Sequence, residues 1–218
     1  MTGTYVQNDF IKLLEKHRVI AILRHMPPEQ TSQVFDALYE GGIRITEITM
    51  NSDSAARQIQ QQHERLGRRM YIGAGTVTTI ERAKAALDAG AQFLVTPNVD
   101  LKIIELAKSH QVPILPGVMT PSEMMMAVSA GIHTLKLFPA AQMGLDYVKA
   151  VKAPLDDIHL VAVGGISPEQ TAEWLQAGCI AVGIGSSLLD MELIRQGQYD
   201  KASEKIASFL NSFSQTVS

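Results

Sequence analysis

The sequence contains a single cysteine, Cys179, among its 218 residues. An intramolecular disulfide is therefore excluded, and one unpaired thiol is typical of a protein from a reducing compartment. Cys179 lies where a helix should end and a strand begin, and no histidine is close to it in sequence. We therefore interpret it as a small buried residue and not as a nucleophile.

Neither a basic excess nor a long apolar run is present. The chain has 19 Lys and Arg against 22 Asp and Glu, a net charge of -3, which lacks the basic footprint of a nucleic-acid-binding protein. No apolar run approaches the ~20 residues that a membrane-spanning helix needs. Residues 1–9 lack the basic and apolar regions of a signal peptide. We expect a soluble, cytoplasmic protein that binds neither nucleic acid nor membrane.

Metal-binding and nucleotide-binding patterns are missing as well. The six histidines show no ligand spacing, so we predict no metal site. The segment 73–77, Gly-Ala-Gly-Thr-Val, does not have the G-x-x-x-x-G-K pattern of a P-loop, which leaves ATP chemistry unsupported.

Eight short apolar runs recur along the chain, and a stretch with helical periodicity follows each. They cover residues 19–24, 43–50, 70–76, 92–97, 112–117, 134–138, 158–164 and 180–185. Near-continuous apolar runs of this length are typical of parallel strands that are covered on both faces. Helix starts are predicted at Thr79, Thr120 and Ser167, and helix ends at the glycines that precede the strands.

This alternation predicts an α/β protein, a single (β/α)8 TIM-barrel domain over residues 1–218. A helix at about residues 7–16 precedes the first strand, and another at about residues 198–213 follows the last. A doubly wound open sheet is the main alternative. It usually has a glycine-rich turn after the first strand, whereas residues 24–28 contain no glycine.

Lys136 is the strongest candidate for a catalytic residue, because it lies inside a predicted strand between aliphatic side chains. In a TIM barrel, the active site is at the C-terminal ends of the strands. Desolvation there would lower the pKa of the ammonium and leave a neutral amine that can attack a ketone and form an imine. The alternative is a lysine at the rim of the sheet, with a packed stem and a solvated head.

Glu47 is the second candidate, since a carboxylate inside an apolar strand is costly unless it is paired or functional. The structural alternative is an ion pair with a neighbouring strand. Beside a neutral lysine, however, Glu47 would be the general acid/base that imine chemistry requires.

The loops after the last two predicted strands are rich in glycine and serine, and such loops bind phosphate in many TIM barrels. Small residues let backbone N–H groups converge, and a short helix near Ser186 would add its dipole. We predict that the phosphate-binding residues are Gly164, Gly165, Gly185, Ser186 and Ser187. Each glycine pair alone could also be a tight turn without a ligand.

Several segments together resemble the KDPG/KHG aldolases, the class I aldolases of 2-keto-3-deoxy-6-phospho sugar acids. They lie at residues 45–51, 72–77, 95–98, 115–118, 135–140, 163–168 and 183–187, so the resemblance covers about residues 10–195. It implies that Lys136 forms the imine, that Glu47 is the general acid/base, and that Thr76 and Pro97 line the keto-acid pocket. It also implies pyruvate and glyceraldehyde 3-phosphate as products, a homotrimer, and no metal or organic cofactor.

Two positions depart from the gluconate-type members of this family. Many of those members have an arginine where Asn51 stands, and we expect Arg24 to bind the substrate carboxylate instead. Val163 replaces a threonine before the paired glycines. Both features resemble the 2-keto-3-deoxy-6-phosphogalactonate branch and favour that epimer or dual specificity. Activity on 4-hydroxy-2-oxoglutarate stays open.

Two other functions fit the glycine-rich loops. A different barrel enzyme for a phosphorylated metabolite, such as an epimerase or a thiamine-phosphate-type synthase, would not need Lys136 as a nucleophile. A non-catalytic sensor of phosphorylated metabolites would tolerate its replacement by methionine. The predicted Lys136–Glu47 pair argues against both, because buried charges without a function are expensive.

Overall fold

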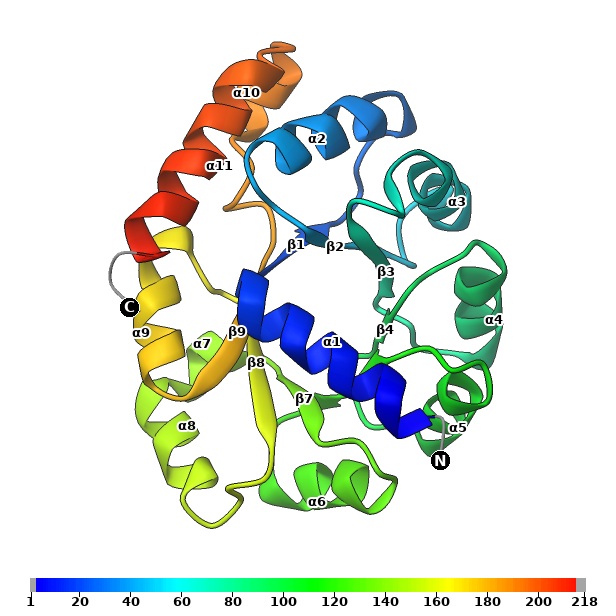
Figure 1. Ribbon diagram of the computed structural model, residues 1–218, viewed down its shortest axis with the longest axis vertical. Coiled ribbons are helices and arrows are strands. Elements are labelled where there is room, and N and C mark those ends of the chain that lie inside the picture. The colour runs from blue at the N-terminus through cyan, green and yellow to red at the C-terminus, as the bar shows by residue number, and fades with distance from the viewer. Residues whose placement is uncertain (1–2, 215–218) are drawn as a thin grey trace.

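The computed structural model describes residues 3–214, which form a barrel of parallel strands inside a ring of helices (Figure 1). Nine strand segments pair in the order β5-β4-β3-β2-β1-β9-β8-β7-β6. They are β1 (Val19–Leu23), β2 (Ile45–Thr49), β3 (Tyr71–Gly75), β4 (Leu94–Val95), β5 (Ile114–Leu115), β6 (Gly117–Val118), β7 (Thr134–Leu137), β8 (His159–Val163) and β9 (Cys179–Ile184).

The fifth predicted strand closes the barrel and is divided into β5 and β6 by Pro116. A proline has no N–H to give to a sheet, but the Pro116 carbonyl still accepts a hydrogen bond from the Lys136 amide at 2.9 Å. The first half pairs with β4 and the second half with β7. β5 and β6 thus count as one strand of the barrel. The nine segments therefore make eight parallel strands, and the predicted TIM barrel is confirmed.

Helices cover the outside of the barrel. They are α2 (Pro28–Glu40), α3 (Ala55–Leu66), α4 (Ile80–Asp88), α5 (Leu101–Ser109), α6 (Pro121–Ser129), α7 (Ala140–Met143), α8 (Leu145–Lys152), α9 (Thr171–Gln176), α10 (Met191–Arg195) and α11 (Tyr199–Ser214). Thr79 and Thr120 cap α4 and α6 as predicted, and Thr120 forms a capping box with Glu123. Ser167 instead begins the 3-10 turn η1 (Pro168–Gln170), which precedes α9.

Helix α1 (Gly3–His17) lies across the N-terminal end of the barrel (Figure 1). Its Phe10 ring lies 5.0 Å from Phe93 and 5.6 Å from Tyr71 between ring centroids, so aromatic side chains fill this end. Phe10 and Leu14 belong to the interior core with residues from the strands. The interior can therefore receive a ligand only through the opposite end.

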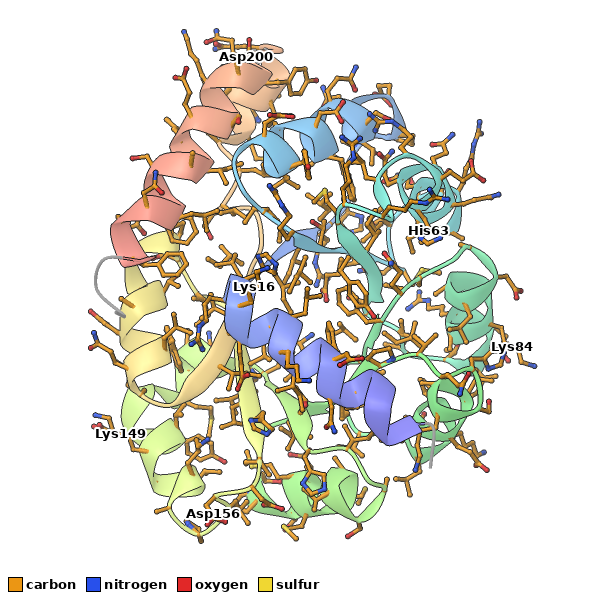
Figure 2. All side chains as sticks on the ribbon, in the orientation of Figure 1. Lys16, His63, Lys84, Lys149, Asp156 and Asp200 are labelled. Atoms are coloured by element: carbon orange, nitrogen blue, oxygen red, sulfur yellow. The ribbon has the colours of Figure 1, made fainter. Side chains whose placement is uncertain are left out.

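The side chains separate into an apolar interior and a charged exterior. A second, larger core fills the space between the strands and the helices. In Figure 2, the labelled Lys84, Lys149 and Asp200 extend outward from the helices. No helix within residues 3–214 combines the length and the apolar character that a membrane crossing requires.

Candidate active site

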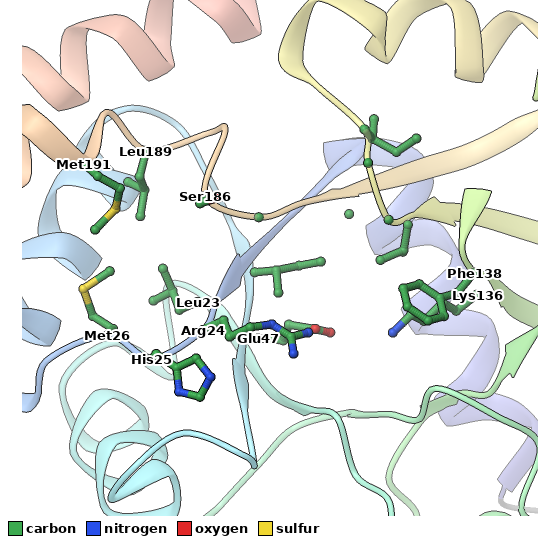
Figure 3. A pocket seen from close by; sticks show the side chains of 17 residues that line it. Leu23, Arg24, His25, Met26, Glu47, Lys136, Phe138, Ser186, Leu189 and Met191 are labelled. Atoms are coloured by element: carbon green, nitrogen blue, oxygen red, sulfur yellow. The ribbon is translucent and has the colours of Figure 1, made fainter. Parts of the chain in front are cut away.

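A cavity of about 390 Å³ opens at the C-terminal ends of the strands (Figure 3). It brings together most of the predicted site residues, which come from five strands of the barrel and the loops that follow them. Those on its lining are Arg24, Glu47, Lys136, Val163, Gly164, Gly165, Gly185 and Ser186. The barrel thus collects into one place residues that are more than 160 positions apart in the sequence.

Glu47 and Lys136 lie at the floor of this cavity. Strand pairing aligns Glu47 with Ile22 and Gly73, and Lys136 with Gly117 and Val161. The two residues are only 3% and 5% exposed, and they are the only charged residues among the buried ones that the structure describes. In Figure 3 both side chains point into the cavity.

A glycine in the neighbouring strand β3 leaves the space that the Glu47 side chain occupies. A Cβ atom at Gly75 would lie 2.3 Å from Oε1 of Glu47. A Cβ atom at Gly183 would likewise lie 2.8 Å from the side chain of Val163, which lines the cavity. Even alanine at position 75 would therefore displace the carboxylate. Glycine at these points of the apolar runs avoids both clashes.

The electrostatic environment favours the neutral forms of both groups. Burial raises the pKa of Glu47, and the positive charges of Lys136 and Arg24 offset part of this effect. Burial lowers the pKa of Lys136, the Glu47 carboxylate opposes the shift, and Arg24 adds to it. A larger fraction of Lys136 is thus a nucleophilic amine at neutral pH than for a lysine in water, and Glu47 holds a proton more readily than a carboxyl group in water.

Arg24 supplies an exposed positive charge at the end of β1. Its guanidinium forms no hydrogen bond or ion pair with any residue from 7 to 213, so its donors are available to a ligand. Figure 3 shows it directed toward the same region as Glu47. A planar guanidinium can hold a carboxylate through two hydrogen bonds.

Phe138 covers Lys136 on the other side, with its ring centroid 4.8 Å from Nζ. Sequence reasoning did not select it as a site residue. The signal was present, because residues two apart in a strand share a face and Phe138 follows Lys136 at that spacing. His25, Met26, Leu189 and Met191 also line the cavity and were missed.

The two loops after β8 and β9 present free backbone donors. Gly164 and Gly165 have φ angles of 97° and 77°, and a Cβ atom at Gly164 would lie 3.0 Å from the Phe138 ring. In the described part of the chain, no acceptor takes a hydrogen bond from the backbone N–H of Gly165, Ser186 or Ser187. Converging free N–H groups form a concave site that suits a phosphate or another anion.

Four predicted residues lie outside the cavity lining. The Ser187 hydroxyl donates to the Ile166 carbonyl at 3.2 Å, so this side chain joins the two loops. The Pro97 backbone lies against Gly117, and Thr76 follows β3 with a φ angle of 53°. Asn51 has a buried Oδ1 that bonds to no other described residue. All four are close to the C-terminal ends of strands without facing the cavity.

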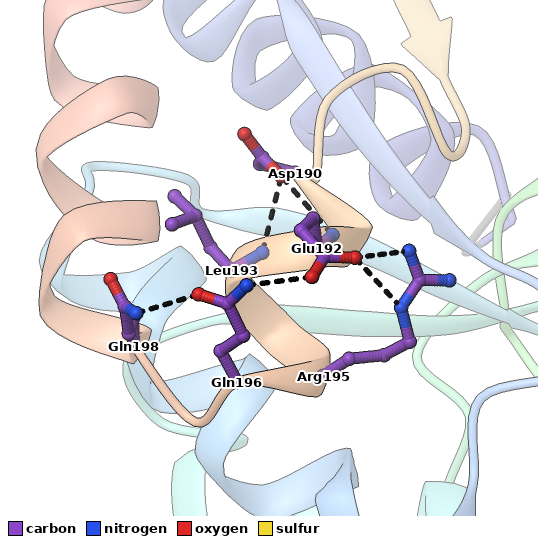
Figure 4. A network of polar contacts seen from close by, with 6 residues as sticks. All are labelled: Asp190, Glu192, Leu193, Arg195, Gln196 and Gln198. Carbon is purple, nitrogen blue, oxygen red and sulfur yellow. Dashed lines mark hydrogen bonds and ion pairs between the residues drawn. The ribbon is translucent and has the colours of Figure 1, made fainter.

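A polar network supports the loop that follows β9 (Figure 4). The Oδ1 atom of Asp190 accepts hydrogen bonds from the backbone of Glu192 and Leu193 and so caps α10, while Oδ2 binds Lys205 of α11 at 2.5 Å. Glu192 accepts hydrogen bonds from Arg195 and Gln196. The Asp190–Lys205 contact attaches the loop with Ser186 to α11, and the others stabilise α10 itself.

Two further kinds of site were considered from the sequence: a metal site, and a nucleophilic thiol at Cys179. Among residues 3–214, no group of three or more His, Cys, Asp or Glu side chains is arranged to hold a metal ion. Cys179 is buried away from the cavity, and burial raises the pKa of its thiol to about 12. The thiol is therefore protonated at neutral pH, as expected for a structural residue.

Comparisons with known proteins agree with this geometry. The family model described as "KDPG and KHG aldolase" matches residues 10–205. The chain is 35% identical over 201 residues to the 2-dehydro-3-deoxy-6-phosphogalactonate aldolase of Escherichia coli (91% of this chain, 96% of that protein). It is 30% identical over 200 residues to the 2-dehydro-3-deoxy-phosphogluconate aldolase of Haemophilus influenzae (91% and 93%). A solved structure described as "Native KDPGal structure" matches with a TM-score of 0.83, 35% identity, and coverage of 91% and 95%.

Proposed function

Because the chain belongs to the KDPG and KHG aldolase family, we propose that its cavity cleaves a 2-keto-3-deoxy-6-phospho sugar acid to pyruvate and glyceraldehyde 3-phosphate through an imine on Lys136. That the protein is an aldolase follows from its family. The observation that supports this assignment of the chemistry is the buried Lys136 beside the buried Glu47 at the open end of the barrel.

The reaction begins with attack of the neutral Lys136 amine on the C2 carbonyl of the substrate. Glu47 transfers a proton to the carbinolamine oxygen, water leaves, and a protonated imine forms. The Glu47 carboxylate left by this step then accepts the proton of the C4 hydroxyl, the C3–C4 bond breaks, and the electron pair of that bond moves into the imine to give an enamine and the free aldehyde. Protonation of C3 and hydrolysis of the new imine release pyruvate and restore the lysine.

The two ends of the substrate meet different binding groups in this proposal. Arg24 binds the carboxylate next to the reacting carbonyl. The phosphate binds the free N–H groups of the glycine loops, where Gly165 and Ser186 lie on the cavity lining. The substrate is thus held at both ends, with the bond to be broken above Lys136 and Glu47, and this orientation lowers the entropic part of the barrier.

We further propose that the 2-keto-3-deoxy-6-phosphogalactonate epimer is preferred. Asn51 and Val163 are the sequence features that motivate this preference, and Val163 lines the cavity with an apolar side chain. Relatives from Escherichia coli and Rhizobium meliloti that are 35% and 38% identical carry the galactonate name. The test compares kcat/KM for the two C4 epimers, and a strong preference for the gluconate compound would contradict the proposal.

For the assembly, we propose that residues 1–218 form one domain and that three copies associate as a homotrimer in the cytoplasm. Large apolar side chains are exposed near the C-terminal ends of β6 and β7 and on α6: Met119, Met125, Met126 and Phe138. Side chains of this kind suit a contact between subunits. Cleavage of unphosphorylated 4-hydroxy-2-oxoglutarate is a second activity to assay, because the same imine chemistry applies to it.

The decisive experiment is reduction with borohydride in the presence of pyruvate, followed by peptide mass spectrometry. We expect irreversible attachment of the reduced three-carbon unit to the Lys136 peptide. The Lys136→Met variant should take up no label, whereas the matched control Lys149→Met, which removes an exposed lysine of α8, should be labelled like the wild type. Labelling of another lysine would refute the role of Lys136.

A further inference from the structure

The turn that follows β1 determines where Arg24 points. Arg24 itself is exposed and makes no side-chain bond to the rest of residues 7–213. The next residue, His25, has a φ angle of 52°, in the left-handed region that residues with a Cβ atom rarely adopt. Such a conformation persists only where the surroundings hold it.

A serine in the turn after the neighbouring strand β2 stabilises this conformation of His25. The backbone N–H of His25 donates to Oγ of Ser52 at 2.8 Å. Ser52 Oγ lies 2.9 Å from Oγ1 of the fully buried Thr49, and the Ser52 amide donates to the Thr49 carbonyl at 2.9 Å. The backbone pairing of β1 with β2 ends at Leu23 and Ile48. The Ser52 side chain therefore connects the two strands beyond their last backbone pair.

We propose that Ser52 is a positioning residue for recognition of the keto-acid carboxylate, acting through the His25 turn on Arg24. This inference rests on the proposed function, in which Arg24 binds the carboxylate. Ser52 is only 9% exposed and is absent from the cavity lining, so it does not touch the ligand. Its hydroxyl keeps the guanidinium on the side of the cavity where Glu47 and Lys136 lie.

The energetic reason is preorganisation. Without the Ser52 hydroxyl, the His25 N–H loses its acceptor and the left-handed turn is free to relax. Arg24, which has no other anchor among the described side chains, would then sample several orientations, and carboxylate binding would have to order it. Pyruvate affinity should weaken, while the chemistry at Lys136 and Glu47 should stay intact.

A double-mutant cycle tests this coupling. Pyruvate affinity is measured from the pyruvate dependence of borohydride inactivation in the wild type, Ser52→Ala, Arg24→Ala and the double variant. We expect Ser52→Ala to weaken pyruvate binding about 5- to 10-fold with an unchanged inactivation rate at saturation. The double variant should bind no more weakly than Arg24→Ala alone, because Ser52 acts only through Arg24.

Controls separate this role from a purely structural one. Ser32→Ala removes a matched hydroxyl that accepts a hydrogen bond from Gln62 between α2 and α3, away from the cavity, and should leave affinity unchanged. Ser52→Thr retains the hydroxyl and should restore most of the affinity. If Ser52→Ala does not fold, Thr49→Val weakens the same anchor and enters the cycle in its place.

The outcomes distinguish the two hypotheses. If Arg24→Ala alone leaves pyruvate affinity unchanged, the carboxylate role in the proposed function is wrong. If Arg24→Ala weakens binding but the anchor variant does not, or if the two effects add in the double variant, Ser52 has only a structural role and the inference is overturned.

Discussion

At the scale of residues, the two groups proposed to carry the chemistry stand out because their surroundings are unusual for ionisable side chains. Glu47 and Lys136 are buried in strands that are otherwise apolar. Burying ionisable groups among apolar residues costs stability, so their presence in these strands points to a function. The charge of each group also shifts the pKa of the other.

Glu47→Gln tests that sensitivity. The Glu47 carboxylate raises the pKa of Lys136, against burial and Arg24, which lower it. Removing the negative charge should therefore lower the pKa of Lys136 further. Imine formation needs the neutral amine and declines as pH falls through this pKa, so its acid limb should move to lower pH.

Loss of the acid/base group should also reduce kcat about 10²- to 10⁴-fold. The measurements are the pH dependence of borohydride inactivation with pyruvate and the steady-state kcat. Glu105→Gln, on the exposed face of α5, is the matched control and should shift neither. An acid limb that stays in place would show that Glu47 does not act on Lys136 through its charge.

At the scale of elements, the loops proposed to bind the phosphate are held by contacts with each other and with α11. The β9–α10 loop is held by the Asp190–Lys205 ion pair to α11 and joined to the β8 loop by Ser187. The lysine of the pair is 64% exposed and the aspartate 30%. Its contribution should accordingly be modest and sensitive to salt.

Lys205→Met is expected to raise KM for the phosphorylated substrate about two- to fivefold at low salt, because the loop with Ser186 loses its attachment to α11. Pyruvate trapping at Lys136 should be unaffected, since pyruvate has no phosphate and the proposal places its carboxylate at Arg24. Lys201→Met removes an exposed lysine of the same helix and serves as the control. An equal loss of pyruvate affinity would indicate general destabilisation instead of a local effect on the phosphate end.

At the scale of the whole molecule, α1 closes one end of the barrel and the cavity opens at the other. Exposed apolar side chains lie on the loop after β6, on α6 and at Phe138, and Phe138 also lines the cavity. Phe138 also lies over Lys136. Association of subunits through this surface would therefore place the contact next to the cavity.

Light scattering should report a trimer for the wild type if the assembly proposal is correct. Met125→Glu combined with Met126→Glu places two charges on the exposed face of α6 and should shift the protein toward smaller species in a concentration-dependent way. Lys201→Glu changes charge on α11, far along the chain, and should leave the trimer intact. A double variant that remains fully trimeric would exclude this face of α6 as a contact.

Local patterns in the sequence were sufficient for the architecture and for the catalytic candidates. The eight apolar runs, the caps at Thr79 and Thr120, and the glycines before the strands depend on interactions within a few residues. A charged residue within an apolar run is conspicuous for the same local reason. Glu47 and Lys136 could thus be selected before their neighbours in space were known, and the resemblance to the aldolase family agreed with the same residues.

Only the tertiary structure decided which side chains face the cavity and which support it. Pro116 divides one strand of the barrel into β5 and β6. Ser187 joins two loops instead of lining the cavity, whereas Leu189 and Met191 do line the cavity. The Ser52–His25 hydrogen bond connects the turns that follow two neighbouring strands. Such contacts depend on how the strands are staggered when the barrel closes, and this stagger arises from packing over the whole chain and not from any local pattern of residues.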